Sequence, residues 1–276
     1  MKALLLTGLL FILILPGCRK ETSILPLLQS VEKLIPMYAD SASVLLDSIQ
    51  APDELTDKDF AHWCMLCGKV TDEAATGLLP IYQWQRAQQW FTEHGTAEEQ
   101  AQIDLYLGRA YVEDGEYDKA MQIYADALQL AKEHQAYNVA GYICAYMADL
   151  YGFRDITSEC LKKREEACEF FKKAENYKSY AYSLKDLAGE WAILDSFACT
   201  IPLLQKADSI SQLLHNKNLT AAIANAFALI YEMQGKYNEA ETAYLKAIST
   251  RSEESYKDSI GLLKVYIKNH KLGNGF

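Results

Sequence analysis

A repeat with a period of forty residues is the feature of this sequence that most restricts its fold. Four copies agree in residue character at six aligned columns, and they start at the small residues Ala101, Gly141, Ala181 and Ala221. The eighth column is small, with Gly108, Ala148, Ala188 and Ala228, and the eleventh is aromatic, with Tyr111, Tyr151, Trp191 and Tyr231. Columns one, four, eight and eleven share one face of a helix. The repeat therefore predicts stacked helices, in which a small residue permits close approach and the aromatic residue one turn away fills the space beside it.

Each copy also carries a break between its two helices. Gly115 and Gly235 stand there in the first and fourth copies, where a residue that tolerates positive φ is wanted. The second and third copies hold Asp155 and Asp195, which we interpret as N-caps of the following helix. Each copy is therefore predicted to be a helix, a turn and a second helix.

Two of the copies resemble the tetratricopeptide repeat. The first contains Leu107, Gly108, Tyr111, Gly115, Tyr117, Ala120, Tyr124 and Ala127. The fourth, over 221–254, contains Tyr231, Gly235, Tyr237, Ala240, Tyr244 and Ala247. The resemblance implies an all-α, right-handed superhelical solenoid of antiparallel helix pairs. Because the period is 40 residues instead of about 34, we expect second helices longer by a turn or more, through segments such as Leu130 to Tyr137.

The two middle copies depart from the family pattern. Arg164 replaces the aromatic residue of the twenty-fourth position, and Pro202 stands near the start of a second helix. Proline is tolerated in the first turn of a helix, so Pro202 is not expected to interrupt the array.

The N-terminus resembles the export signal of a bacterial lipoprotein. An apolar run from Ala3 to Leu15 is too short to span a bilayer, and Gly17-Cys18 resembles a lipobox. We predict cleavage before Cys18 and a lipid (palmitate) on this residue; the alternative is an ordinary secretory signal with a coincidental cysteine. Because Arg19 and Lys20 follow the anchor, we expect a protein of the bacterial outer membrane that faces the periplasm.

The chain is thus predicted to have one array with an anchor before it and a cap after it. The parts are a signal peptide (1–17), a lipidated tether (18–30), N-terminal helices of the array (31–100), four repeats (101–140, 141–180, 181–220 and 221–254), and a C-terminal capping helix and tail (255–276). Helices are expected at Thr56 to Glu73 and Pro80 to His94. A polar outer face of the cap is expected from Lys257, Lys264, Lys268 and Lys271.

Charge and motifs exclude several classes of function. The mature chain would have a net charge of −11, because the signal removes Lys2 from a chain of net charge −10. No nucleic-acid partner is expected, since phosphate binding needs clustered excess Lys and Arg. The sequence has no nucleophile elbow, zinc-protease motif or phosphate-binding loop. We therefore expect no enzyme activity, no cofactor and no small-molecule substrate.

Trp63-Cys64-Met65-Leu66-Cys67 resembles the motif of thioredoxin-like proteins. A reactive thiolate there would need a preceding strand and a helix N-terminus, whereas the flanking residues follow a helical pattern. We expect two small buried residues on a packing face. Only one close cysteine pair is present, so a zinc site is poorly supported. Disulfides and core thiols both remain open for Cys64, Cys67, Cys144, Cys160, Cys168 and Cys199.

The resemblance also implies where a partner binds. In the family, residues two, five and nine of each first helix commonly face a bound segment. The corresponding candidates are Gln102, Leu105, Arg109, Tyr142, Ala145, Asp149, Tyr182, Lys185, Asn225 and Leu229. Tyr142 and Tyr182 are the expected aromatic anchors. No copy pairs Lys at five with Asn at nine, as carboxylate-binding members of the family do.

These features predict a lipid-anchored scaffold or adaptor that binds another protein or peptide segment of the cell envelope. One alternative is a periplasmic sensor arm that passes a signal to a separate regulator. A thiol-active protein that uses Cys64 and Cys67 is the least favoured alternative. The expected partner is a protein, and the membrane is reached through the N-terminal lipid.

Overall fold

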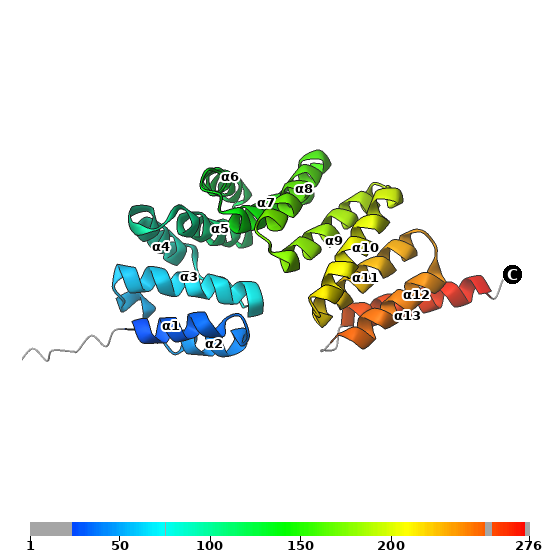
Figure 1. The fold of residues 1–276 in the computed structure, drawn as a ribbon, viewed down its shortest axis with the longest axis horizontal. Helices are drawn as coiled ribbons and strands as arrows, with labels where there is room; N and C mark the ends of the chain where they lie inside the picture. The colour runs from blue at the N-terminus through cyan, green and yellow to red at the C-terminus, as the bar shows by residue number, and fades with distance from the viewer. Residues whose placement is uncertain (1–23, 75, 252–255, 274–276) are drawn as a thin grey trace, which may run out of the picture.

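The computed structural model describes residues 24–74, 76–251 and 256–273. Over these residues the chain forms α-helices and one short 3-10 turn, Pro52–Glu54, without a strand. The helices are α1 (Leu25–Leu34), α2 (Ala39–Asp47), α3 (Asp57–Ala74), α4 (Ile81–His94), α5 (Ala97–Glu113), α6 (Tyr117–Glu133), α7 (Tyr137–Phe153), α8 (Thr157–Lys173), α9 (Tyr177–Ile193), α10 (Phe197–Leu213), α11 (Lys217–Met233), α12 (Tyr237–Thr250) and α13 (Tyr256–Gly273). They stack into an arc, with α1–α4 on one arm and α9–α13 on the other (Figure 1). The predicted all-α solenoid of antiparallel helix pairs is confirmed.

The repeating unit is regular from α5 to α11. Each of these helices is 17 residues long. The expectation of longer second helices is wrong, because α6 ends at Glu133 and Tyr137 already begins α7. First and second helices are instead equally long, and α7 begins four residues before Gly141, the start used to align the sequence. α10 continues through Pro202, so the array is not interrupted, as predicted; Pro202 is the sixth residue of the helix, however, and not in its first turn.

A residue with positive φ follows each helix of the regular array. Gly115 and Gly235 have φ of 79° and 71°, as predicted. Asp155 and Asp195 take the same conformation, with φ of 56° and 55°, so the interpretation of these residues as N-caps is wrong. The next N–H after Asp155 bonds back to the carbonyl of Tyr151 at 2.9 Å. This is the Schellman arrangement, which needs a left-handed residue at that place.

The small residue of the eighth column makes room for a different ring from the one expected. A Cβ on Gly108 would overlap the ring of Tyr124, which comes from the second helix. Tyr111, the aromatic residue one turn away, is only partly buried. Tyr124 is fully buried, and its ring centroid lies 6.3 Å from that of Tyr146 in the next pair. The Tyr124 ring therefore joins α5, α6 and α7.

The forty-residue register continues before α5. Ala61, Gly68, Trp84 and Ala87 stand forty residues before Ala101, Gly108, Tyr124 and Ala127. Trp84 is fully buried, and its ring lies 5.3 Å from Tyr106, just as Tyr124 lies near Tyr146. α3 and α4 are therefore one more pair of the same kind, and α1 and α2 pack on α3.

α13 continues the forty-residue register, because Gly261 stands forty residues after Ala221 and meets the Tyr244 ring. Tyr266 of the same helix is 45% exposed. The Nζ of Lys268 lies 2.6 Å from the Oε1 of Glu232 on α11. Of the lysines expected on the outer face of the cap, Lys264 and Lys268 are exposed, whereas the side chains of Lys257 and Lys271 lie outside the described residues. Apolar side chains of the same helix are exposed as well: Ile260, Leu263 and Ile267.

The predicted signal peptide, residues 1–17, and Cys18 lie outside the described residues. α1 starts at Leu25 and buries Leu28, so the last part of the range expected to be a tether, 18–30, is helical. Among the helices that the structure describes, none has the length and apolar character needed to cross a membrane.

Candidate ligand groove

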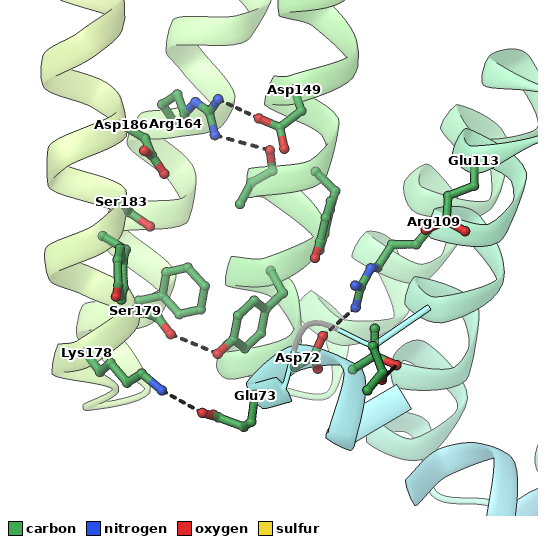
Figure 2. Close-up of a pocket in the computed structure, with 17 residues that line it drawn as sticks. Asp72, Glu73, Arg109, Glu113, Asp149, Arg164, Lys178, Ser179, Ser183 and Asp186 are labelled. Carbon is green, nitrogen blue, oxygen red and sulfur yellow. Dashed lines mark hydrogen bonds and ion pairs between the residues drawn. The ribbon is translucent and has the colours of Figure 1, made fainter. Parts of the chain in front are cut away.

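A cavity of about 600 Å³ opens on the concave face of the arc. The first helices of four consecutive pairs, α3, α5, α7 and α9, line it with one face each, and α8 adds two side chains (Figure 2). Its charged and aromatic lining residues are Asp72, Glu73, Arg109, Glu113, Tyr142, Tyr146, Asp149, Arg164, Phe171, Lys178, Tyr182 and Asp186. We refer to this cavity as the groove.

Two ion pairs tie α3 to the helices opposite it. Arg109 of α5 contacts Asp72, which also accepts a hydrogen bond of 2.8 Å from the Tyr106 hydroxyl. Burial raises the pKa of Asp72, and the charge of Arg109 opposes this shift. Lys178 of α9 reaches Glu73 at 2.8 Å, although 105 residues separate them in the sequence. The groove is thus bridged at one end by side chains from distant repeats (Figure 2).

Arg164 occupies the other end of the groove. Its side chain is 12% exposed and donates to Asp149 at 2.6 Å and to Glu190 at 3.5 Å. Burial raises the pKa of Asp149, and Arg164 opposes that shift. In the first and fourth copies this position holds the buried rings of Tyr124 and Tyr244. The divergence noticed in the sequence therefore replaces a core ring with a charged group that faces the groove.

Aromatic side chains line the groove between the two charged ends. The hydroxyl of Tyr142 lies 2.8 Å from the Ser179 hydroxyl, and its ring packs edge-on against Phe171 at 4.8 Å between centroids. The guanidinium of Arg109 lies 4.9 Å from the centroid of the Tyr146 ring. These contacts hold the rings in place, so the lining of the groove is formed before any ligand binds.

The structure brings together half of the residues that the resemblance nominated. Those that line the groove are Arg109, Tyr142, Ala145, Asp149 and Tyr182. Asn225 and Leu229 line a separate pocket beside α13. Whether any of these residues binds a partner stays a prediction.

The remaining three candidates lie outside the cavity. Leu105 is 1% exposed and belongs to the core cluster, because a large apolar side chain at this position is drawn inward where the other copies have Ala, Lys or Asn. It cannot contact a partner in this conformation. Gln102 donates to the Tyr106 hydroxyl at 2.9 Å, and Lys185 contacts Asp186.

Several groove residues were not among the sequence candidates. Asp72 and Glu73 belong to α3, which lay outside the four aligned copies. Extending the forty-residue register to Ala61 and Gly68 would have included this helix. Lys178 and Asp186 lie one turn on either side of Tyr182 on α9, so helical spacing from Tyr182 could have found them.

The two cysteines of the motif that resembles thioredoxin lie in surroundings that do not activate a thiol. Cys64 and Cys67 stand in the middle of α3, and burial is the main cause that raises the pKa of both. The thiolate is therefore disfavoured at the motif that resembles thioredoxin. The cysteines of the described residues are all free thiols: Cys64, Cys67, Cys144, Cys160, Cys168 and Cys199. Within the same residues, no group of three or more His, Cys, Asp or Glu could hold a metal ion.

Two family models match the chain. Both are described as Tetratricopeptide repeat, one over residues 107–135 and the other over residues 220–254. These segments fall in the first and fourth copies, where the resemblance is clearest. No curated protein sequence matches the chain.

Solved structures of similar fold share little sequence with the chain. A Rap protein complexed with Competence and Sporulation Factor matches with a TM-score of 0.63 and 15% identity, over 91% of this chain and 73% of that one. NprR in complex with its cognate peptide NprX matches with a TM-score of 0.59 and 14% identity, over 92% and 75% of the two chains. A Podosopora anserina protein with nearly identical TPR-like repeats matches with a TM-score of 0.52 and 14% identity, over 73% and 96%. The chain therefore contains tetratricopeptide repeats at residues 107–135 and 220–254, within an array of stacked helix pairs.

Proposed function

We propose that this chain is a scaffold or adaptor that binds a peptide segment of another protein in the groove. The observation that carries the proposal is the convergence of α3, α5, α7 and α9 on one cavity, with polar and aromatic side chains already oriented toward it. Concave cavities with a few oriented polar groups are typical binding sites. Two proteins of similar fold have been solved with a bound factor or peptide. At 14–15% identity they support the kind of ligand and not its sequence.

The pairing of charges in the groove limits the chemistry of this ligand. Arg109, Arg164 and Lys178 each already contact a carboxylate. At Arg109 and Arg164, whose side chains are largely buried, a ligand carboxylate would have to displace the carboxylate already paired there, and leaving that charge without a partner is costly. A segment bound through side chains and backbone, against Tyr142 and Tyr182, fits the groove better than one held by its C-terminal carboxylate.

We propose further that the protein is attached to the bacterial outer membrane and faces the periplasm. The support is the sequence before the array, with its apolar run from Ala3 to Leu15 and the following Cys18, Arg19 and Lys20. A lipid on Cys18 would place the array at the membrane without a spanning helix. Palmitate labelling of cells that express the full chain tests this: Cys18→Ser should abolish both the label and the sedimentation with outer membranes. Unchanged labelling would contradict the assignment of the anchor. If the chain is instead a sensor arm that passes a signal to a separate regulator, that regulator would bind in the same groove.

The groove itself is tested with peptides. A phage-displayed library of dodecapeptides is selected against residues 19–276, and the affinity of selected peptides is measured by fluorescence anisotropy. Replacing Tyr142 and Tyr182 by Ala together should weaken binding by at least about tenfold, as expected when aromatic anchors are lost. The matched control replaces Tyr117 and Tyr177, which are 43% and 47% exposed and lie outside the groove. Equal losses in both double variants, or a selection without binders, would overturn the proposal.

A further inference from the structure

The end of the groove around Arg164 has more negative than positive charge. Five carboxylates line the groove, against three cations. Two of the carboxylates, Asp72 and Glu73, are matched by Arg109 and Lys178 at the α3 end. Of the remaining lining acids, Glu113 lies on α5 one turn after Arg109 (Figure 2). At the Arg164 end, two lining acids, Asp149 and Asp186, therefore face one lining cation, Arg164.

Three carboxylates converge on this single guanidinium. Asp149 and Glu190 accept hydrogen bonds from Arg164, and the charge of Asp186 also acts on it. Asp149, Arg164 and Asp186 gather at one end of the groove (Figure 2). Lys185 contacts Asp186 but does not line the cavity. Three carboxylates, Asp149, Asp186 and Glu190, thus stand against two cations, Arg164 and Lys185. Like charges held together in a partly buried site repel one another, and one further cation would relieve the remaining repulsion.

The surroundings of these carboxylates suit a cationic side chain. Tyr182 lies one turn before Asp186 on α9, so its ring and the carboxylate share one helix face. The groove already contains such a contact at its other end, where the Arg109 guanidinium lies 4.9 Å from the Tyr146 ring centroid and contacts Asp72. A cation over a tyrosine ring with a carboxylate beside it is stabilised by both. The net charge of the whole chain, −10, also attracts cations toward the groove.

We infer that the end of the groove formed by Tyr182, Asp149 and Asp186 binds a lysine or arginine side chain of the peptide ligand. This inference rests on the proposed function, because it names the residue type that the groove selects. The basic side chain lies against Tyr182 and pairs with Asp186, while Arg164 keeps its contact with Asp149. The neighbouring residues of the peptide lie in the adjacent part of the groove, along Tyr142 and Ala145.

The peptides selected on the groove provide the test. Those that lose affinity when Tyr142 and Tyr182 are replaced should contain a lysine or arginine, and replacing that residue by glutamine should weaken binding about tenfold. Asp186→Asn should weaken the basic peptide by a similar factor and leave its glutamine form unchanged, so that the two changes are coupled. Asp195→Asn is the matched control, because it removes the same charge from an exposed turn after α9. This control variant should bind the basic peptide and its glutamine form with unchanged affinity.

The outcomes separate this inference from the proposed function. Groove-dependent peptides without a basic residue, or a basic peptide that binds equally to the Asp186→Asn variant, would overturn the inference and leave peptide binding standing. A preference for acidic peptides would overturn it as well. Binding of the basic peptide should also weaken as NaCl is raised from 50 to 500 mM, since the contact is electrostatic. If no peptide depends on the groove, both proposals fail together.

Discussion

At the scale of single residues, space beside one glycine decides how closely two helices approach. Gly108 lies against the face of the Tyr124 ring, and a Cβ at this position would overlap it. Tyr124 is fully buried between three helices, so its ring has no free direction in which to move. The same relation holds between Gly68 and Tyr106. Glycine at these places is required by packing and not by backbone conformation.

This relation predicts that Gly108→Ala lowers the free energy of unfolding by about 1–3 kcal/mol, the usual cost of overpacking a core. Gly189 provides a matched control, because it also lies within a first helix but has no atom within 4 Å of an added Cβ. There the substitution should raise stability by up to about 1 kcal/mol, through better helix propensity. Urea denaturation measures the change in the free energy of unfolding for each variant, and the two changes should have opposite signs. A loss of stability in both would show that the close contact with Tyr124 is not the cause.

Only some of the residues that line the groove could be predicted from the sequence. Tyr142, Asp149 and Tyr182 could be nominated from the sequence, because the resemblance to the tetratricopeptide repeat marks the second and ninth positions of each first helix, and helical spacing puts these on one face. Leu105 could not be excluded in the same way, since its burial depends on how far α7 lies from it. Asp72 and Glu73 face the groove only because the arc brings α3 opposite α9. No local pattern encodes a contact between residues 105 positions apart.

At the scale of elements, the fold follows from the forty-residue spacing, but the helix ends do not. Small residues at regular intervals predicted the paired helices, and the resemblance to the tetratricopeptide repeat implied their antiparallel order. The ends depend on residues with positive φ, and only Gly115 and Gly235 carry a sequence signal for that conformation. Gln135, Glu175 and His215 take it as well, with φ of 58°, 55° and 49°. Nothing in the residue type of Gln135, which follows α6, indicates a turn, so this helix was expected to continue past its true end.

These turns predict a stabilising substitution. Glu175 is exposed and holds a left-handed conformation that disfavours a residue with a Cβ. Glu175→Gly should therefore raise the free energy of unfolding by about 0.5–1 kcal/mol, because glycine is the preferred residue at this position of a Schellman turn. Glu165→Gly, an equally exposed glutamate inside α8, should lower it by about 1 kcal/mol. Thermal denaturation distinguishes the two, and a loss in the turn variant would contradict the role assigned to positive φ.

At the scale of the whole molecule, the question is what holds the arc in its curvature. The pair between Lys178 and Glu73 bridges the two arms, but its side chains are 46% and 41% exposed. Exposed ion pairs contribute only about 0–1 kcal/mol. The buried contacts between neighbouring helices, such as the rings of Tyr124 and Tyr146, are far more extensive. The stacking of neighbouring helices therefore sets the curvature of the arc, and the ion pair between Lys178 and Glu73 contributes little to it.

An arc shaped by stacking keeps its groove open to the same width with or without the bridge. Lys178→Ala should lower the free energy of unfolding by less than about 1 kcal/mol and leave the radius of gyration, measured by small-angle X-ray scattering, unchanged. Lys246→Ala is the matched control, since Lys246 is also 46% exposed and pairs with Asp208 of a neighbouring pair at 3.2 Å. A larger radius for the Lys178 variant alone would mean that the bridge closes the arms. If the radius stays constant, the groove is preorganised, and a peptide can bind without the cost of ordering the array around it.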